Sequence, residues 1–263
     1  MRIWVESAGI TGPGLAGWDA SRAILAGDTA CPGGEMVLPK LELLPPVERR
    51  RTGALVKLVL ATGQDALARR PAEISFLPSV FASSGGDGDV INEICTTLAG
   101  SDRQVSPTRF HNSVHNAPAG YWSIATGSRA PSTSLSAFEW SFAAGLVEAA
   151  SQVVSEYDHV LLIAADVPYP QPLLGVRKVK LPFGSALLLA GNRSEQSLGA
   201  LDIRIAERSE QTRLSEPLLE QLREDNPSAR GLPLFAALAA GKAASVVLDY
   251  VGGKSLVVEL SPC

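Results

Sequence analysis

Two short segments that are almost entirely apolar place the tightest limit on the fold of this chain. Residues 160–165 read VLLIAA and residues 185–190 read SALLLA. A strand with one face in water alternates apolar and polar residues, whereas a strand buried on both faces is apolar nearly throughout. The two segments therefore predict a β-sheet with helices packed on both faces, which is the layered arrangement of an α/β protein.

The remaining sequence supplies the helices that such a sheet needs. Residues 53–70 carry apolar side chains three and four positions apart, as in an amphipathic helix. Similar patterns predict helices at residues 19–25, 90–98, 116–126, 137–157, 215–224 and 233–240. We expect short or extended β-structure at residues 3–5, 74–81 and 129–135, an irregular segment at 28–46, and a final hairpin of 246–251 and 255–260. No clear linker or repeat interrupts this order, so we expect a single domain over residues 1–263.

Composition excludes several classes of function. Lys and Arg number 23 against 27 for Asp and Glu, and a net charge of −4 is not that of a nucleic-acid-binding protein. No segment approaches the roughly 20 apolar residues of a membrane span, and the first residues lack the apolar stretch of a signal peptide. Three scattered cysteines do not make a disulfide framework, so we expect a cytoplasmic protein.

Three motifs favour a cofactor only at first sight. The segment from Gly12 to Gly17 fits G-x-G-x-x-G, but the acidic strand end that dinucleotide binding needs does not follow it. His111 and His115 stand four apart, yet no third zinc ligand is evident. The segment GGKS at 252–255 lacks the first glycine of a phosphate-binding loop and joins two strands. We therefore expect neither cofactor nor metal.

The stretch from Ser106 to Pro168 resembles the core of a β-ketoacyl synthase of the thiolase superfamily. It contains Asn116-Ala-Pro-Ala-Gly-Tyr-Trp-Ser-Ile-Ala-Thr-Gly127, then Arg129-Ala-Pro-Ser-Thr-Ser134, a long helix and the strand ending at Asp166. In looser form the resemblance spans residues 1–190. It implies a thiolase-like α/β/α fold, truncated to essentially the N-terminal half of a ketosynthase.

The resemblance also implies that the catalytic cysteine is absent. Active members hold this cysteine at the N-terminus of a buried helix, where backbone N–H groups and the helix dipole lower its pKa and stabilise an oxyanion. An ungapped match puts Ala137 in its place. Active members also use two histidines from their C-terminal half, and we expect the chain to end before that half.

Short proteins of this kind resemble the chain length factors of aryl polyene and related type II polyketide or fatty-acid synthesis. These non-catalytic subunits form heterodimers with a full-length β-ketoacyl synthase and close its acyl tunnel, so the acyl carrier protein is an indirect partner. The resemblance implies an interface strand formed by Ala130, Pro131, Ser132, Thr133, Ser134 and Leu135. It implies a length gate formed by His111, Val114, His115, Pro118, Phe138 and Trp140.

Two alternatives remain open. A weak acyl-transfer enzyme would use Ser134, Ser136 or Cys95 with His111 or His115 as base, although no spacing supports a triad. A binding or scaffolding module for acyl carrier protein would use the cluster Arg49-Arg50-Arg51 against an acidic helix.

Overall fold

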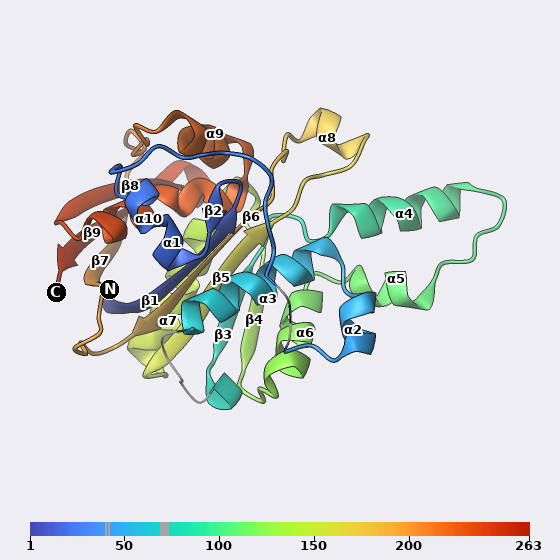
Figure 1. Cartoon of the computed structure of the whole chain (residues 1–263), viewed down its shortest axis with the longest axis horizontal. Helices are drawn as coiled ribbons and strands as arrows, with labels where there is room; N and C mark the ends of the chain where they lie inside the picture. Colours follow the sequence, from blue (N-terminus) through green and yellow to red (C-terminus); the bar gives the residue numbers. More distant parts are fainter. Residues whose placement is uncertain (40, 42, 69–73) are drawn as a thin grey trace.

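A computed structural model of the chain describes residues 1–39, 41, 43–68 and 74–263 (Figure 1). The described residues form one sheet of nine strands. Its order is β4 (Ser132–Leu135), β3 (Ser79–Ala82), β5 (His159–Asp166), β6 (Phe183–Ala190), β1 (Arg2–Gly12), β7 (Gly199–Ala206), β9 (Lys254–Pro262) and β8 (Ala244–Tyr250), with β2 (Leu15–Ala16) paired to the end of β1. The pairs β4–β3 and β3–β5 are parallel, and the other pairs are antiparallel.

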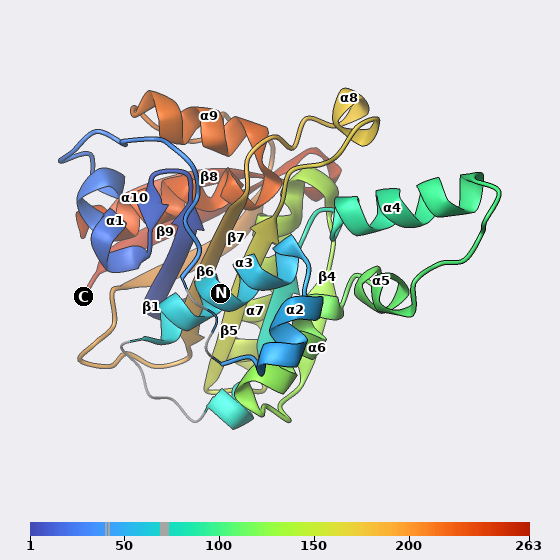
Figure 2. The ribbon, with the colours of Figure 1, turned by 45° about the vertical axis from the view of Figure 1, so that its right-hand side comes forward.

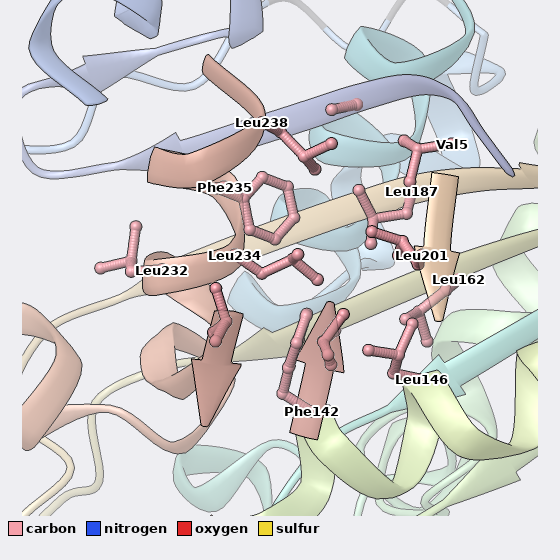
Figure 3. Close-up of a cluster of buried hydrophobic side chains, with 14 of the residues drawn as sticks. Val5, Phe142, Leu146, Leu162, Leu187, Leu201, Leu232, Leu234, Phe235 and Leu238 are labelled. Carbon is pink, nitrogen blue, oxygen red and sulfur yellow. The ribbon is translucent and has the colours of Figure 1, made fainter. Parts of the chain in front are cut away.

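Helices cover both faces of this sheet, as the apolar segments predict. Alternate residues of β5 enter two different cores: Leu161 and Ile163 pack with α3 (Ala54–Leu67) and α6 (Ala117–Thr126), whereas Val160 and Leu162 pack with α7 (Ser141–Ser155). In Figure 3, Phe142 and Leu146 of α7 gather in one cluster with side chains of the sheet and of α10 (Leu232–Ala240). The layered α/β arrangement is confirmed.

The two apolar strands are buried on both faces although they run antiparallel. Leu162 pairs with Leu187, and both are fully buried. In β1 the register shifts between Val5 and Ser7, so Val5 and Ala8 reach the same core despite their odd spacing. Burial, and not parallel pairing, is therefore what the apolar sequence of these strands reports.

The other helices lie around this framework. They are α1 (Trp18–Leu25), α2 (Pro46–Arg51), α4 (Gly88–Ala99), α5 (Pro107–Asn112), α8 (Leu173–Val176) and α9 (Pro217–Asp225), with 3-10 helices η1 (Ile74–Phe76), η2 (Phe138–Trp140), η3 (Pro227–Gly231) and η4 (Val251–Gly253). Both Figure 1 and Figure 2 show α4 and α5 projecting from the body, and we call residues 88–112 the α4–α5 arm. None of the helices in the described ranges has the length and apolar character that crossing a bilayer requires.

Most predicted elements are present, and the differences are local. The predicted helices and the final hairpin are confirmed within a few residues, although residues 69 and 70 of the predicted helix 53–70 lie outside the described residues. The described part of the predicted irregular segment 28–46 is irregular up to Pro46, where α2 begins. The predicted extended segment 74–81 begins instead as the 3-10 helix η1, and the predicted unbroken helix from Ala137 begins with η2. The helices α2, α5 and α8 and the strands β2 and β7 were not predicted.

Candidate functional site

The carboxyl ends of three parallel strands bring distant parts of the chain to one place. Ala82 of β3 lies opposite Leu135 of β4 and Ala164 of β5. The segments that follow these strands therefore leave the sheet at the same edge. They are the loop 83–87, the turn 136–140 and the loop 167–182, and together they form the candidate site.

The turn 136–140 leads from β4 into α7. Ala137, which the resemblance places at the cysteine position, precedes η2, and α7 begins only at Ser141. The buried Ser141 Oγ accepts a hydrogen bond from Ala137 N at 3.1 Å and donates one to the Phe138 carbonyl at 2.7 Å. This closed turn explains why the helix does not run unbroken from Ala137. The side chains of residues 137–140 are methyl, phenyl, carboxylate and indole, so this turn carries no thiol.

Phe138 has an unusual backbone. Its φ is +56°, the one positive φ outside glycine among the described residues. A bulky residue in the left-handed region costs on the order of 1–3 kcal/mol and persists where the surroundings hold it. Its side chain is 54% exposed, so the strain serves to place a ring at the surface.

Asp166, at the end of β5, anchors the loop 83–87. Its buried carboxylate accepts hydrogen bonds from Ser84 N and Ser84 Oγ, both at 2.7 Å, from Ser83 Oγ at 3.1 Å and from Ser228 Oγ at 2.6 Å. Burial raises the pKa of the Asp166 carboxyl above its ordinary value, and the serine donors oppose that rise. These hydrogen bonds hold the loop 83–87 against the end of β5.

Arg177, from the loop after β5, covers the turn. Its Nε and Nη2 each donate to Glu139 Oε1 at 3.1 Å, and its guanidinium carbon lies 4.1 Å from the centre of the Phe138 ring. Its Nη1 donates to the Ser84 carbonyl at 3.3 Å and to Tyr169 Oη at 3.0 Å. Only 14% of this side chain is exposed.

Tyr169 links Arg177 to the hydrogen-bonded pair Ser84 and Asp166. Burial raises the pKa of its phenol, so the hydroxyl stays protonated. The Ser84 Oγ already donates to Asp166, so the Tyr169 hydroxyl, 3.3 Å away, donates to that oxygen while it accepts from Arg177. A continuous chain of hydrogen bonds thus joins Asp166 to Glu139.

The structure gathers three of the six predicted gate residues around the loop 83–87. His115 Nε2 lies 3.0 Å from the Ser83 carbonyl, and since a carbonyl only accepts, this nitrogen is the donor. Ser136 Oγ donates to the Ser84 carbonyl at 2.9 Å, which brings the turn to the same loop. The rings of Phe138 and Trp140 have centres 6.4 Å apart.

The other three predicted gate residues lie elsewhere. His111 is exposed at the end of α5, with its ring edge-on to Tyr121 at 6.0 Å. Val114 is 48% exposed between α5 and α6, whereas Pro118 is buried at the start of α6. Of the six, Pro118 therefore has the least surface to offer a partner.

The predicted interface strand lies at the end of the sheet. Residues 132–135 form β4, which pairs with β3 on one side only within the described chain. Ala130 is half-buried and Pro131 is exposed before it, and the four strand residues are half-buried or exposed. One backbone edge of β4 is therefore open.

The nucleotide and metal motifs have structural explanations. After Gly12 the chain turns back as β2, antiparallel to β1, and the Asp65 carboxylate accepts hydrogen bonds from Ile10 N and Trp18 N. A carboxylate there opposes binding of a pyrophosphate. The helix α5 ends at Asn112, so His111 and His115 do not share a helix face. The segment 252–255 lies at the β8–β9 hairpin turn, as predicted.

The nucleophiles of the acyl-transfer alternative do not meet a base. Cys95 is exposed on α4, and Ser136 Oγ and His115 Nε2 bond to two different carbonyls of the loop 83–87. Across the described ranges, no hydrogen bond joins Ser134, Ser136 or Cys95 to a histidine.

The arginine cluster of the carrier-protein alternative lies on α2. Arg49 is half-buried and donates to the Leu44 carbonyl at 3.2 Å, which leaves Arg50 and Arg51 exposed.

Sequence reasoning did not identify Arg177, Glu139 or Asp166 as site residues. Asp166 had a usable signal, because it is the one charged residue at the end of an apolar strand. Arg177 had none, because its partners come from three segments that only the folded sheet brings together.

Solved structures of similar fold include chains of ketosynthase assemblies. One is a chain from the ketosynthase ApeO in complex with its chain length factor ApeC from Xenorhabdus doucetiae, with 21% identity, a TM-score of 0.74, and 98% of this chain and 99% of that chain covered. A chain of the ishigamide ketosynthase/chain length factor has 13% identity, a TM-score of 0.74 and 99% coverage of both chains. A chain of AntDE:AntF, a type II acyl carrier protein in complex with its ketosynthase, has 11% identity, a TM-score of 0.77, and 100% of this chain and 99% of that chain covered. At these identities the likeness establishes the fold.

The family assignment comes from the sequence itself. No curated protein sequence matches the chain. The family model for the beta-ketoacyl synthase, N-terminal domain, matches residues 18–248, which include β3, β4, β5, β6 and β7 and most of β8. The thiolase-like fold implied by the stretch 106–168 is therefore confirmed, and the chain belongs to the beta-ketoacyl synthase N-terminal domain family.

Proposed function

We propose that this chain is a non-catalytic chain length factor. As a single-domain cytoplasmic subunit without cofactor or metal, it pairs with an active β-ketoacyl synthase and shapes its acyl tunnel in aryl polyene or type II polyketide or fatty-acid synthesis. The observation that carries the proposal is the turn 136–140 at the N-terminus of α7. In place of a thiol, this turn holds Phe138 and Trp140 and is covered by the Arg177–Glu139 ion pair.

The open edge of β4 supports the pairing. A strand from a similar subunit placed along residues 132–135 would extend the sheet and satisfy the free backbone groups. The likeness to complexes of ketosynthases with chain length factors supports the same arrangement. The acyl carrier protein then meets the assembled pair through the ketosynthase.

The apolar groups beside this edge support the gate. Phe138 and Val114 are about half exposed, and their neighbours Trp140 and His115 are half-buried. Side chains of this size fill a tunnel end, and forcing additional methylenes against them costs roughly 1–3 kcal/mol. A growing acyl chain would therefore stop at a defined length.

Reconstitution with the cognate ketosynthase tests the proposal. The chain alone should show no acyl adduct by intact-mass spectrometry after incubation with an acyl thioester. The pair should elute as a heterodimer and release products of defined length, and a ketosynthase without its own cysteine should release none. An adduct on this chain, or product lengths that do not depend on its presence, would overturn the proposal.

Two exposed valines provide a matched test of the gate. Val114 is 48% exposed next in sequence to His115, which bonds the loop 83–87, and Val154 is 52% exposed near the end of α7. Val114→Trp should shorten the main product in the reconstituted pair, because the indole extends into the tunnel end. Val154→Trp should leave product length unchanged. Equal effects of the two variants would remove Val114 from the gate.

A further inference from the structure

The ring of Phe138 is held in place from outside its own turn. The backbone on each side is fixed, since Ser136 Oγ donates to the Ser84 carbonyl and Ser141 Oγ bonds to both Ala137 N and the Phe138 carbonyl. These contacts fix the backbone but leave the side chain free, because 54% of it is exposed. Two groups contact the ring itself. The Trp140 indole of the same turn has its ring centre 6.4 Å away, and the Arg177 guanidinium, from outside the turn, lies nearer, 4.1 Å from the ring centre.

Arg177 is in turn held in a single orientation. Two of its nitrogens donate to one oxygen of Glu139, and the third donates to Tyr169 Oη and to the same Ser84 carbonyl that binds Ser136. A planar guanidinium can make these in-plane hydrogen bonds and also stack its face on an aromatic ring. A lysine ammonium in the same place keeps the charge but loses the planar fork.

The charges around the turn favour this arrangement. Glu139 lies between two cations, with Arg177 at 3.1 Å from Oε1 and Arg230 at 3.8 Å from Oε2. Both arginines are mostly buried, with side chains 14% and 26% exposed. Arg230 therefore attracts the second oxygen of Glu139 from the η3 side and favours the position in which the carboxylate binds Arg177.

We propose that Arg177 is a positioning residue that sets product length through Phe138. It holds the strained turn so that the phenyl ring projects from the N-terminus of α7, where an active synthase would carry its nucleophile. The ring, and not the arginine, then meets the growing chain. This inference rests on the proposed function, because it needs a partner whose tunnel ends at this turn.

The test compares Arg177→Lys with Phe138→Gly in the reconstituted pair, with product lengths read by mass spectrometry. Glycine removes the ring and adopts the positive φ without strain, so this variant keeps the turn. Both single variants should shift the main product to longer chains by a similar amount. The double variant should give no further shift, because the two residues act through one ring. Arg204→Lys, at an exposed arginine on β7, serves as the control and should give wild-type lengths.

Heterodimer formation and urea unfolding of each variant separate positioning from folding. Arg177→Lys should still form the heterodimer and unfold in one cooperative transition. If it fails to fold or pair, Arg177 is a structural residue and the inference is wrong. The inference is also wrong if Arg177→Lys gives wild-type lengths while Phe138→Gly lengthens the product, or if the two shifts add. If neither Phe138→Gly nor Val114→Trp changes product length, the proposed function itself fails.

Discussion

The two end strands of the sheet differ in whether other residues cover the backbone groups of their outer edges. At the β8 end, Val247 N donates to Thr212 Oγ1 and the Val247 carbonyl accepts from Thr212 N, both at 2.9 Å. At the β4 end no such cover exists within the described residues, although β4 is the shorter strand. Proteins normally protect an exposed edge because it pairs with other chains. The difference agrees with the proposal that β4 pairs with a partner strand.

The direction of the free groups on β4 follows from its pairing with β3. The carbonyls of Pro131 and Leu135 accept from Ser79 N and Ser83 N, so the odd-numbered residues of β4 face β3. Because backbone groups alternate along a strand, the N–H and carbonyl of Ser132 and Ser134 face outward. These two residues are the ones that a partner strand would bind.

A proline at the open edge should give the largest effect. Ser134→Pro removes an outward N–H and places a ring against the partner strand, while the hydrogen bonds to β3 remain. A lost donor together with a partner carbonyl left unsatisfied costs roughly 3 kcal/mol, which weakens heterodimer affinity about 100-fold. Titration of the labelled chain with the ketosynthase measures this.

The matched control lies at the covered edge. Val247 faces outward on β8, so Ser245, two residues away, also faces outward. Ser245→Pro makes the same chemical change there and should leave the affinity for the ketosynthase unchanged. If Ser134→Pro binds as tightly as Ser245→Pro, the partner does not use the β4 edge.

Substitution of Asp166, at the end of β5 two strands from the open edge, should give the next largest effect. It anchors Ser84, whose carbonyl binds Ser136 at the end of β4. Asp166→Leu replaces the carboxylate by a larger apolar group and leaves the four serine donors without an acceptor, which should cost at least roughly 2 kcal/mol of unfolding free energy. Asp166→Asn should cost less, because its amide oxygen still accepts and the hydroxyl of Ser228 can rotate to accept from its NH₂. Urea unfolding compares the variants, and equal stability of the Leu and Asn variants would contradict this account.

The pH dependence of stability gives the same residue a second test. The pKa of Asp166 is raised in the folded protein, so the native state holds this proton at pH values where the unfolded chain has released it. The contribution is therefore fully present below the ordinary value of 3.8 and is lost as pH rises through the folded pKa. Asp166→Asn should remove this loss, so the difference in stability between variant and wild type should shift in favour of the variant as pH rises from 4. A constant difference would show that Asp166 does not titrate.

A second comparison, between the buried strands and the start of α7, explains which parts of the fold the sequence predicts. The strands β5 and β6 were predicted because nearly all of their residues are buried, and a run of apolar residues indicates burial whichever elements provide it. The start of α7 was not, because it is set by Ser141 and by Arg177, which is 38 residues from Glu139 in sequence. Propensity within 136–140 contains no trace of that distant contact.

The missed elements differ in how much signal they had. In β7, Leu201 and Ile203 alternate with Asp202 and Arg204, a pattern typical of a half-buried strand that sequence reading could have found. The short helix α5 had no such pattern, since it lies on the projecting arm and leaves Phe110 66% exposed. A helix leaves an apolar period in the sequence where it buries an apolar face, and α5 buries only Asn112.

The cover over β8 should give the smallest effect when removed. Thr212→Val keeps the shape of the side chain and the bond from residue 212 N to the Val247 carbonyl, but it removes the acceptor for Val247 N. One lost hydrogen bond at a partly buried site costs about 1 kcal/mol in urea unfolding. The uncovered N–H should also promote self-association at high concentration, measured by analytical ultracentrifugation. Thr212→Ser keeps the hydroxyl and should match wild type in both measurements. If the valine and serine variants behave alike, the hydroxyl does not protect this edge, and the contrast between β8 and β4 rests on strand length and position alone.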